Sequence, residues 1–254
     1  MILDLFRLDG KTAIVTGASR GLGQGMAVAL AEAGTDVALL STNKSNLQQT
    51  AELIAKYNRK ALQISCDVTK KEDIKNTIDS VMKEFGRIDI LVNNAGIQRR
   101  APAEEFTDED WDIVMDTNLK SVFRLCRDVG NIMLKQGSGK IINIASLLSF
   151  SGGITVPAYT ASKGGVAQLT KAFANEWASK NIQVNAIAPG YFDTNNTEAL
   201  VNDPVRNRQI SERIPAGRWG NPNDMKGAVV FLASSASDYV NGHILMVDGG
   251  WMAR

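Results

Sequence analysis

Tyr159 and Lys163 stand four residues apart, thirteen residues after Ser146. Four residues is about one turn of an α-helix, so on a helix both side chains lie on one face. A free phenol has a pKa of about 10, and a neighbouring ammonium group would lower it by stabilising the phenolate. The Ser146 hydroxyl could hydrogen-bond a carbonyl oxygen as negative charge develops on it. These side chains suit the interconversion of a carbonyl and an alcohol, although Tyr-x-x-x-Lys also occurs on amphipathic helices without a function.

A glycine-rich turn lies near the N-terminus, between a predicted strand and a predicted helix. Residues 12–16 form a β-branched apolar run, residues 17–23 read Gly-Ala-Ser-Arg-Gly-Leu-Gly, and helical spacing of apolar residues follows from residue 26. Glycine lets the backbone approach a pyrophosphate closely, and a helix N-terminus offers it unpaired N–H groups. The spacing is G-x-x-x-G-x-G rather than G-x-G-x-x-G. The turn therefore favours a dinucleotide site, with an ordinary tight turn as the alternative.

Together these motifs resemble the short-chain dehydrogenase/reductase family over essentially the whole chain. The matching segments are residues 16–23, residues 93–96 (Asn-Asn-Ala-Gly), Asn118, Ser146, Tyr159, Lys163, and Pro189 with Gly190. The resemblance implies a nicotinamide-dependent oxidoreductase with Asn118, Ser146, Tyr159 and Lys163 as its catalytic residues. Asn118 lies in a helix predicted over 110–129, where the family has a backbone kink.

The resemblance also implies a set of cofactor-binding residues. They are Gly17, Ser19, Arg20, Gly21, Leu22, Gly23, Ser41, Thr42, Asp67, Val68, Asn94, Ala95, Gly96, Tyr159, Lys163, Pro189 and Gly190. Asp67 and Val68 would surround the adenine, although Asp67 could instead cap the following helix. Asn94 could also tie adjacent loops together through its side chain.

Cofactor choice depends on the end of the second strand, where residues 40–43 read Leu-Ser-Thr-Asn. Relatives that prefer NAD usually carry an acidic residue there to bind the ribose hydroxyls. Arg20 and the hydroxyls of Ser41 and Thr42 could accept a 2′-phosphate, whereas the resemblance of the chain to one group within the family favours NAD(H). We expect both cofactors to work, with NAD(H) slightly favoured over NADP(H).

Six longer segments resemble the 2-dehydro-3-deoxy-D-gluconate 5-dehydrogenases and their gluconate 5-dehydrogenase relatives. These segments are residues 93–100, 141–146, 185–191, 194–197, 213–220 and 247–254. The resemblance implies hydride transfer between NAD(P) and a secondary alcohol or ketone on a sugar acid of uronate catabolism. A 3-ketoacyl-carrier-protein reductase shares the motifs and stays an alternative, as does a non-catalytic dinucleotide-binding sensor.

A sugar acid needs a cation for its carboxylate, and Arg99 and Arg100 directly follow the Asn-Asn-Ala-Gly turn. The planar guanidinium can hold a carboxylate through two parallel hydrogen bonds. Alternatively, both arginines form exposed ion pairs with Glu104 and Glu105. The expected substrate-binding residues are Arg99, Arg100, Ser146, Tyr159 and Asn195, with Arg218 and Arg254 as further carboxylate candidates. A loop rich in Asn and Thr, at residues 191–213, is predicted to cover the substrate.

Composition excludes several classes of protein. The 254 residues carry 28 Lys and Arg against 27 Asp and Glu, which gives no reason to expect nucleic acid or an anionic membrane as partner. No apolar run approaches a membrane span or a secretory signal, which predicts a cytoplasmic protein. Cys66 and Cys126 are isolated and predict reduced packing residues rather than a metal site. His243 is the only histidine, so a Ser-His-Asp hydrolase is disfavoured.

Apolar runs alternate with amphipathic stretches along the whole chain. They occur at residues 13–15, 37–40, 62–64, 88–92, 141–144, 182–187 and 244–247. Strands that alternate with helices predict a mainly parallel, doubly wound, seven-stranded Rossmann-type α/β sheet with helices on both faces, in a single domain over residues 1–254. The apolar segments 229–232 and 244–247 suit the two-fold contacts of a homotetramer, and an intrachain core is an equally good interpretation of them.

Overall fold

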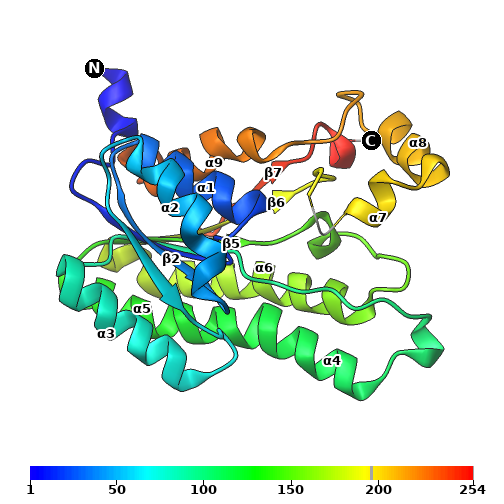
Figure 1. Ribbon diagram of the computed structural model, residues 1–254, viewed down its shortest axis with the longest axis horizontal. Helices are drawn as coiled ribbons and strands as arrows, with labels where there is room; N and C mark the ends of the chain where they lie inside the picture. Colours follow the sequence, from blue (N-terminus) through cyan, green and yellow to red (C-terminus); the bar gives the residue numbers. More distant parts are fainter. Residues whose placement is uncertain (195–196, 254) are drawn as a thin grey trace.

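The computed structural model of the protein describes residues 1–194 and 197–253. In this part of the chain, seven parallel strands form one sheet in the order β3-β2-β1-β4-β5-β6-β7 (Figure 1). The strands are β1 (Thr12–Thr16), β2 (Asp36–Ser41), β3 (Ala61–Ser65), β4 (Ile90–Asn93), β5 (Gly139–Ile144), β6 (Ile182–Pro189) and β7 (Ile244–Val247). The strand order reverses between β1 and β4, which is where ligands bind in open α/β sheets. The predicted doubly wound parallel sheet is confirmed.

Helices cover both faces of this sheet (Figure 1). One face carries α1 (Gly21–Glu32), α2 (Gln48–Ala55) and α9 (Lys226–Ala233), and the other carries α3 (Lys71–Phe85), α5 (Ser121–Gln136) and α6 (Pro157–Trp177). Strand β1 explains the two layers, because Ala13 and Val15 belong to the core under α1 whereas Ile14 belongs to the core under α5 and α6. Alternate side chains of a strand point to opposite faces, so a strand buried on both faces is apolar throughout.

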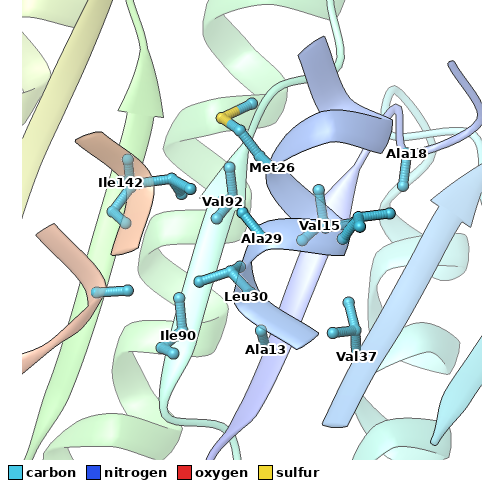
Figure 2. Packing of buried hydrophobic residues seen from close by; sticks show 14 of the residues in the cluster. Ala13, Val15, Ala18, Met26, Ala29, Leu30, Val37, Ile90, Val92 and Ile142 are labelled. Atoms are coloured by element: carbon cyan, nitrogen blue, oxygen red, sulfur yellow. The ribbon is translucent and has the colours of Figure 1, made fainter. Parts of the chain in front are cut away.

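The packing of α1 on the sheet positions the glycine turn. Met26 and Leu30 of α1 lie over Val15 and Val92 of the central strands (Figure 2). Both α1 side chains are fully buried, and burying a side chain of this size contributes about 1.5–3 kcal/mol. Because α1 is held over β1 and β4, its N-terminus stays at the carboxyl end of β1.

One long helical stretch contains a π-helical turn. Helix α4 (Asp108–Met115) continues through the π turn (Asp116–Lys120) into α5. The helix predicted over 110–129 is therefore too short at both ends, and the π turn lies where the family resemblance implies a backbone kink. Thr107 caps the N-terminus by accepting from the Asp110 N–H at 3.1 Å, and Gly137 ends α5 with a φ of 75°. The π turn contains Asn118, and such turns often accompany functional sites.

The segment after β6 forms two short helices, α7 (Glu198–Val201) and α8 (Pro204–Arg213). Ile210 of α8 and Ile214 pack with the buried Trp251 and Leu147 in a small third apolar cluster. Helix α8 is thus attached to the C-terminal segment of the chain. That this region covers a substrate stays a prediction.

The fourth strand begins two residues later than the sequence predicts. Ile88 is buried, as its apolar side chain requires, but it precedes the ladder of β4. The Asp89 N–H donates to the Thr12 carbonyl and the Asp89 carbonyl accepts from the Lys140 N–H, both at 2.9 Å, so backbone bonds to both neighbouring strands begin at Asp89. The Asp89 carboxylate also accepts from the Thr12 N–H at 2.9 Å and from Arg87. None of the helices in the described residues is long and apolar enough to cross a membrane.

Candidate active site

A pocket of about 310 Å³ opens at the carboxyl ends of β1, β4, β5 and β6. It gathers most of the residues that the sequence predicts for the site. Of the predicted cofactor-binding residues, Gly17, Ser19, Arg20, Gly21, Leu22, Gly23, Asn94, Ala95, Gly96, Pro189 and Gly190 line it, together with Ser146, Tyr159 and Lys163.

The glycine turn between β1 and α1 leaves space that a side chain would fill. A Cβ on Gly23 would lie 2.2 Å from the Gly17 carbonyl oxygen, and Gly17 and Gly21 have φ values of 63° and 57°. Only glycine adopts such conformations without strain. The turn therefore brings backbone N–H groups and the N-terminus of α1 to the pocket wall, an arrangement that fits a pyrophosphate.

Asn94 ties the turn after β4 to the turn after β1. Its side-chain amide donates to the carbonyls of Thr16 and Gly17 at 2.9 and 3.1 Å. The buried Thr16 hydroxyl in return accepts from the N–H groups of Asn94 and Ala95, both at 2.9 Å. These bonds occupy the amide nitrogen of Asn94. Asn94 therefore contributes to the pocket by holding the turns after β1 and β4 together.

Ser146 lies at the pocket two residues after the end of β5, and its neighbours fix it there. Its hydroxyl oxygen accepts from the Leu148 N–H at 3.2 Å, and its own N–H donates to the Ser149 hydroxyl at 3.3 Å. The Ser149 hydroxyl also donates to the Lys163 carbonyl on α6 at 2.7 Å. The turn after β5 is thereby attached to the helix that carries Tyr159 and Lys163.

Tyr159 and Lys163 lie on one face of α6, as the four-residue spacing predicts. The Lys163 ammonium is 5.7 Å from the centre of the Tyr159 ring and donates to the Ile144 carbonyl at 2.5 Å. Lys163 is 5% exposed, and burial lowers the pKa of its ammonium to about 8.

The expectation that Lys163 lowers the pKa of Tyr159 is wrong. The Tyr159 pKa is raised above 10.0, because burial of the phenol outweighs a hydrogen bond with Ser146 and the positive charge of Arg100. The Lys163 ammonium faces the Tyr159 ring and the Ile144 carbonyl, and it is not among the groups that shift the pKa of Tyr159.

Asn118 lies beneath the pocket and does not line it. Its fully buried side chain bonds the backbone of Ile97, accepting from the N–H at 2.8 Å and donating to the carbonyl at 2.9 Å. It also donates to the Ser162 hydroxyl at 3.3 Å. The π turn thus connects the segment after β4 to α6.

The predicted adenine-side residues lie outside this pocket. Ser41 ends β2 and Thr42 follows it, and Asp67 and Val68 follow β3. The Asp67 carboxylate accepts from the N–H and hydroxyl of Thr69 at 3.0 and 2.7 Å, which forms an Asx turn. Helix α3 begins at Lys71, so Asp67 is not its N-cap.

The arginines differ in their partners. Arg99 is paired with Asp110 at 3.2 Å, and not with Glu104 or Glu105 as the alternative interpretation suggests. The charge of Arg100 acts on the Tyr159 hydroxyl, where it lowers the phenol's pKa against the larger effect of burial.

Of the three other substrate-binding candidates, only Arg218 lies in the described residues, and it is already paired. Both guanidinium nitrogens of Arg218 bond the Asp224 carboxylate, at 2.8 and 2.9 Å. This pair holds the pKa of Asp224 at about 2. Asn195 and Arg254 lie outside the described residues.

Several residues that line the pocket are not among the site residues that the sequence predicts. They are Ile97, Gln98, Ile144, Ala145, Phe192, Thr194 and Thr197. Thr194 and Thr197 lie in the polar loop after β6 and could have been selected from it. The others carry no chemical signal, because their place on the wall depends on which face of each turn points inward.

The cysteines and the histidine lie apart from this chemistry. Cys66 and Cys126 are free and buried, and burial raises the pKa of Cys126 to about 12. Among the described residues, no group of three or more His, Cys, Asp or Glu side chains is arranged to hold a metal.

The chain is similar to a known family and to curated proteins along nearly its whole length. A family model described as enoyl-(acyl carrier protein) reductase matches residues 17–252. The chain is 56% identical over 251 residues to the 2-dehydro-3-deoxy-D-gluconate 5-dehydrogenase of Bacillus subtilis (strain 168), covering 99% of this chain and 98% of that protein.

Solved structures resemble the protein closely. A putative 2-deoxy-D-gluconate 3-dehydrogenase from Agrobacterium tumefaciens with bound NADP is 54% identical and covers 99% of this chain and 100% of its own, with a TM-score of 0.93. A gluconate 5-dehydrogenase from Burkholderia cenocepacia in complex with NADP and tartrate is 43% identical and covers 100% of both chains, with a TM-score of 0.96. The chain therefore belongs to the short-chain dehydrogenase/reductase family.

Proposed function

We propose that the protein interconverts a secondary alcohol and a ketone on a sugar acid with NAD(P), most closely as a 2-dehydro-3-deoxy-D-gluconate 5-dehydrogenase. The observation that carries this proposal is the shared pocket, in which Ser146, Tyr159 and Lys163 face a glycine turn suited to a pyrophosphate. The 56% identical relative and the gluconate 5-dehydrogenase structure support a sugar acid as the substrate class.

In this proposal, a bound nicotinamide donates or accepts the hydride. The protein holds the substrate oxygen and moves its proton. The Ser146 hydroxyl is fixed at the pocket wall by its bond from the Leu148 N–H, and in this proposal it donates its proton to the substrate oxygen as negative charge develops there. Such preorganised donors reduce the reorganisation needed when the reaction occurs.

Tyr159 is the proposed proton donor and acceptor. Burial raises the pKa of its phenol above 10.0, so the hydroxyl keeps its proton near neutral pH and can give it to the oxygen of a ketone during reduction. Oxidation reverses this step, and Tyr159 then takes the alcohol proton. Proton transfer from a well-placed group commonly contributes about 10²–10⁴ in rate.

Lys163 has two proposed roles. Its ammonium, which has a pKa of about 8, remains largely protonated at neutral pH and supplies positive charge beside Tyr159. The resemblance to the family assigns it the ribose hydroxyls of the cofactor as well. Asn118 supports the site from below by fixing the backbone at Ile97.

Arg100 is the proposed anchor for the substrate carboxylate. It is favoured over Arg99, since the Arg99 guanidinium is paired with Asp110 whereas the Arg100 charge acts at the Tyr159 hydroxyl. A carboxylate bound there would place the sugar beside the proton donor. The adjacent Arg99, which is paired with Asp110, serves as the control for a substitution of Arg100.

The protein uses NAD(P), and we propose that it accepts both cofactors. Arg20 is exposed at the glycine turn, and hydroxyls rather than a carboxylate stand at Ser41 and Thr42. This set suits a 2′-phosphate, and two of the similar structures contain NADP. The slight preference for NAD(H) stays a prediction without support from these residues.

We also propose a cytoplasmic homotetramer. Strand β7 forms one edge of the sheet and all four of its residues are only partly buried. Val229 and Leu232 of α9 belong to the intrachain core, while Val230 and Phe231 are partly exposed. An unpaired, half-exposed apolar edge of this kind is commonly covered by another subunit.

The proposed function is tested by turnover on a panel of sugar acids. Hydroxy and keto sugar acids, a 3-ketoacyl thioester and a matching neutral sugar are each incubated with NAD(H) and NADP(H), while nicotinamide absorbance is followed. We expect the highest kcat/KM on 2-dehydro-3-deoxy-D-gluconate or its oxidised partner, with gluconate second. Preference for the ketoacyl thioester would favour the carrier-protein reductase, and cofactor binding without turnover would favour a sensor.

A further inference from the structure

Gln98 contacts Arg100 at the edge of the pocket. Gln98 lines the pocket wall and stands two residues before the arginine. With its oxygen directed to the guanidinium, the orientation that gives both groups complementary partners, it accepts from Arg100 Nη2 at 2.8 Å and from Nε at 3.3 Å. Two bonds to one planar fork restrain the direction of the guanidinium as well as its distance.

An exposed arginine in this position needs such a restraint. Fixing a long, flexible side chain costs up to about 2 kcal/mol of conformational entropy. Arg99 illustrates the alternative, because the Asp110 carboxylate holds it at 3.2 Å and partly neutralises it. A neutral amide differs from a carboxylate in that it orients a guanidinium without cancelling the charge.

Gln98 thus has two properties that a carboxylate at this place could not have together. It lies on the wall of the pocket that contains Tyr159, and it leaves the positive charge of Arg100 available to an anionic group in that pocket. We propose that Gln98 is a positioning residue, whose side-chain amide holds Arg100 so that the guanidinium receives the carboxylate of the substrate. This inference rests on the proposed function and on the role given there to Arg100.

The test is a double-mutant cycle on a sugar acid and on the matching neutral sugar. The variants are Gln98→Leu, which removes the acceptor at similar size, Arg100→Ala, and the two combined. We expect Gln98→Leu to reduce kcat/KM on the acid about tenfold, mainly through KM, and to leave the neutral sugar within about twofold. In the Arg100→Ala background, Gln98→Leu should have no further effect on the acid.

Gln98→Glu separates orientation from charge. The glutamate keeps an acceptor for Arg100 but pairs with it as a carboxylate and cancels its charge. We therefore expect Gln98→Glu to lower kcat/KM on the sugar acid at least as much as Gln98→Leu does. Cofactor affinity, measured by nicotinamide fluorescence, should stay within about twofold of wild type in all variants, which shows that the pocket is intact.

Each contrary result has a distinct meaning. Suppose that Arg100→Ala lowers kcat/KM on the acid selectively. If Gln98→Leu then lowers kcat/KM on the acid and on the neutral sugar alike, or has the same effect in the Arg100→Ala background as in wild type, the positioning role of Gln98 is overturned and the role of Arg100 as the anchor stands. If Arg100→Ala does not discriminate between the two compounds, the proposed anchor is overturned together with the role of Gln98. Wild-type activity by Gln98→Glu on the acid would also overturn the positioning role as stated.

Discussion

The Lys163 ammonium lies over the ring of Tyr159, 5.7 Å from its centre, and donates to the Ile144 carbonyl. Burial favours the neutral form of both side chains, because it lowers the pKa of Lys163 to about 8 and raises the pKa of Tyr159. Burial of the charged Lys163 ammonium therefore costs folding free energy near neutral pH, whereas Tyr159 is neutral there in both the folded and the unfolded state. That cost gives the first prediction.

Lys163→Met should abolish turnover and stabilise the fold without cofactor at pH 7. Burial of the charge costs up to about 3 kcal/mol, judged from the shift from 10.5 to about 8. Loss of the bond to the Ile144 carbonyl offsets roughly 1 kcal/mol of the gain. We expect a net increase of about 1–2 kcal/mol in the free energy of unfolding, measured by urea denaturation.

The pH dependence of this difference provides a control. Below about pH 8 the lysine is charged in both states and the penalty is complete. Between about pH 8 and 10.5 the unfolded chain binds the proton and the folded protein does not, so wild-type stability rises relative to Lys163→Met. A difference that stays constant between pH 7 and 10 would contradict the buried-charge account.

The two adjacent arginines should behave differently toward a carboxylate. Arg100→Ala should reduce kcat/KM on a sugar acid by about 1.5–3 kcal/mol in transition-state binding and spare the neutral sugar. Arg99→Ala removes an exposed pair with Asp110, worth at most about 1 kcal/mol, and should affect both compounds little. Equal, small effects of both substitutions on both compounds would reject Arg100 as the anchor.

Cofactor choice is tested at the glycine turn. Arg20→Ala should lower kcat/KM for NADP(H) by about tenfold or more, because a charge-assisted contact to the 2′-phosphate is lost, and leave NAD(H) within about twofold. Equal effects on the two cofactors would indicate that Arg20 does not contact the 2′-phosphate. A wild-type kcat/KM for NADP(H) more than about tenfold above that for NAD(H), or 1.4 kcal/mol, would overturn the slight preference for NAD(H).

Periodicity and motif order were sufficient to predict the sheet. Its seven strands follow from apolar runs separated by helical stretches, because a parallel strand buried on both faces has to be apolar throughout. The spacing of Tyr159 and Lys163 also predicted their shared face on α6, since helical geometry is local.

Side-chain partners were not predictable in the same way. The bond network of Asn118 depends on a π turn that brings it to Ile97, 21 residues away in sequence. Arg99 and Arg100 are chemically identical in sequence, and only the fold directs one of them to Asp110. Gln98 lies in the segment 93–100 that carries the resemblance, but its role was not predicted, because the sequence does not show that its side chain contacts Arg100.

The assembly is tested by light scattering of the purified protein at micromolar concentration. We expect the mass of a tetramer of the 27.5 kDa chain, because another subunit would cover the half-exposed apolar residues of β7. A mass corresponding only to the monomer would reject the assembly and leave the partly buried residues of α9 and β7 to the surface.

The most direct test of the account compares wild type with Tyr159→Phe on 2-dehydro-3-deoxy-D-gluconate, following nicotinamide absorbance for turnover and nicotinamide fluorescence for cofactor binding. Phenylalanine keeps the packing of the ring and removes only the hydroxyl that exchanges the proton. We predict substrate-dependent turnover by wild type, no measurable turnover by Tyr159→Phe, and nearly equal cofactor affinities. A substantial fraction of wild-type turnover in Tyr159→Phe, with the cofactor bound as tightly, would contradict the account.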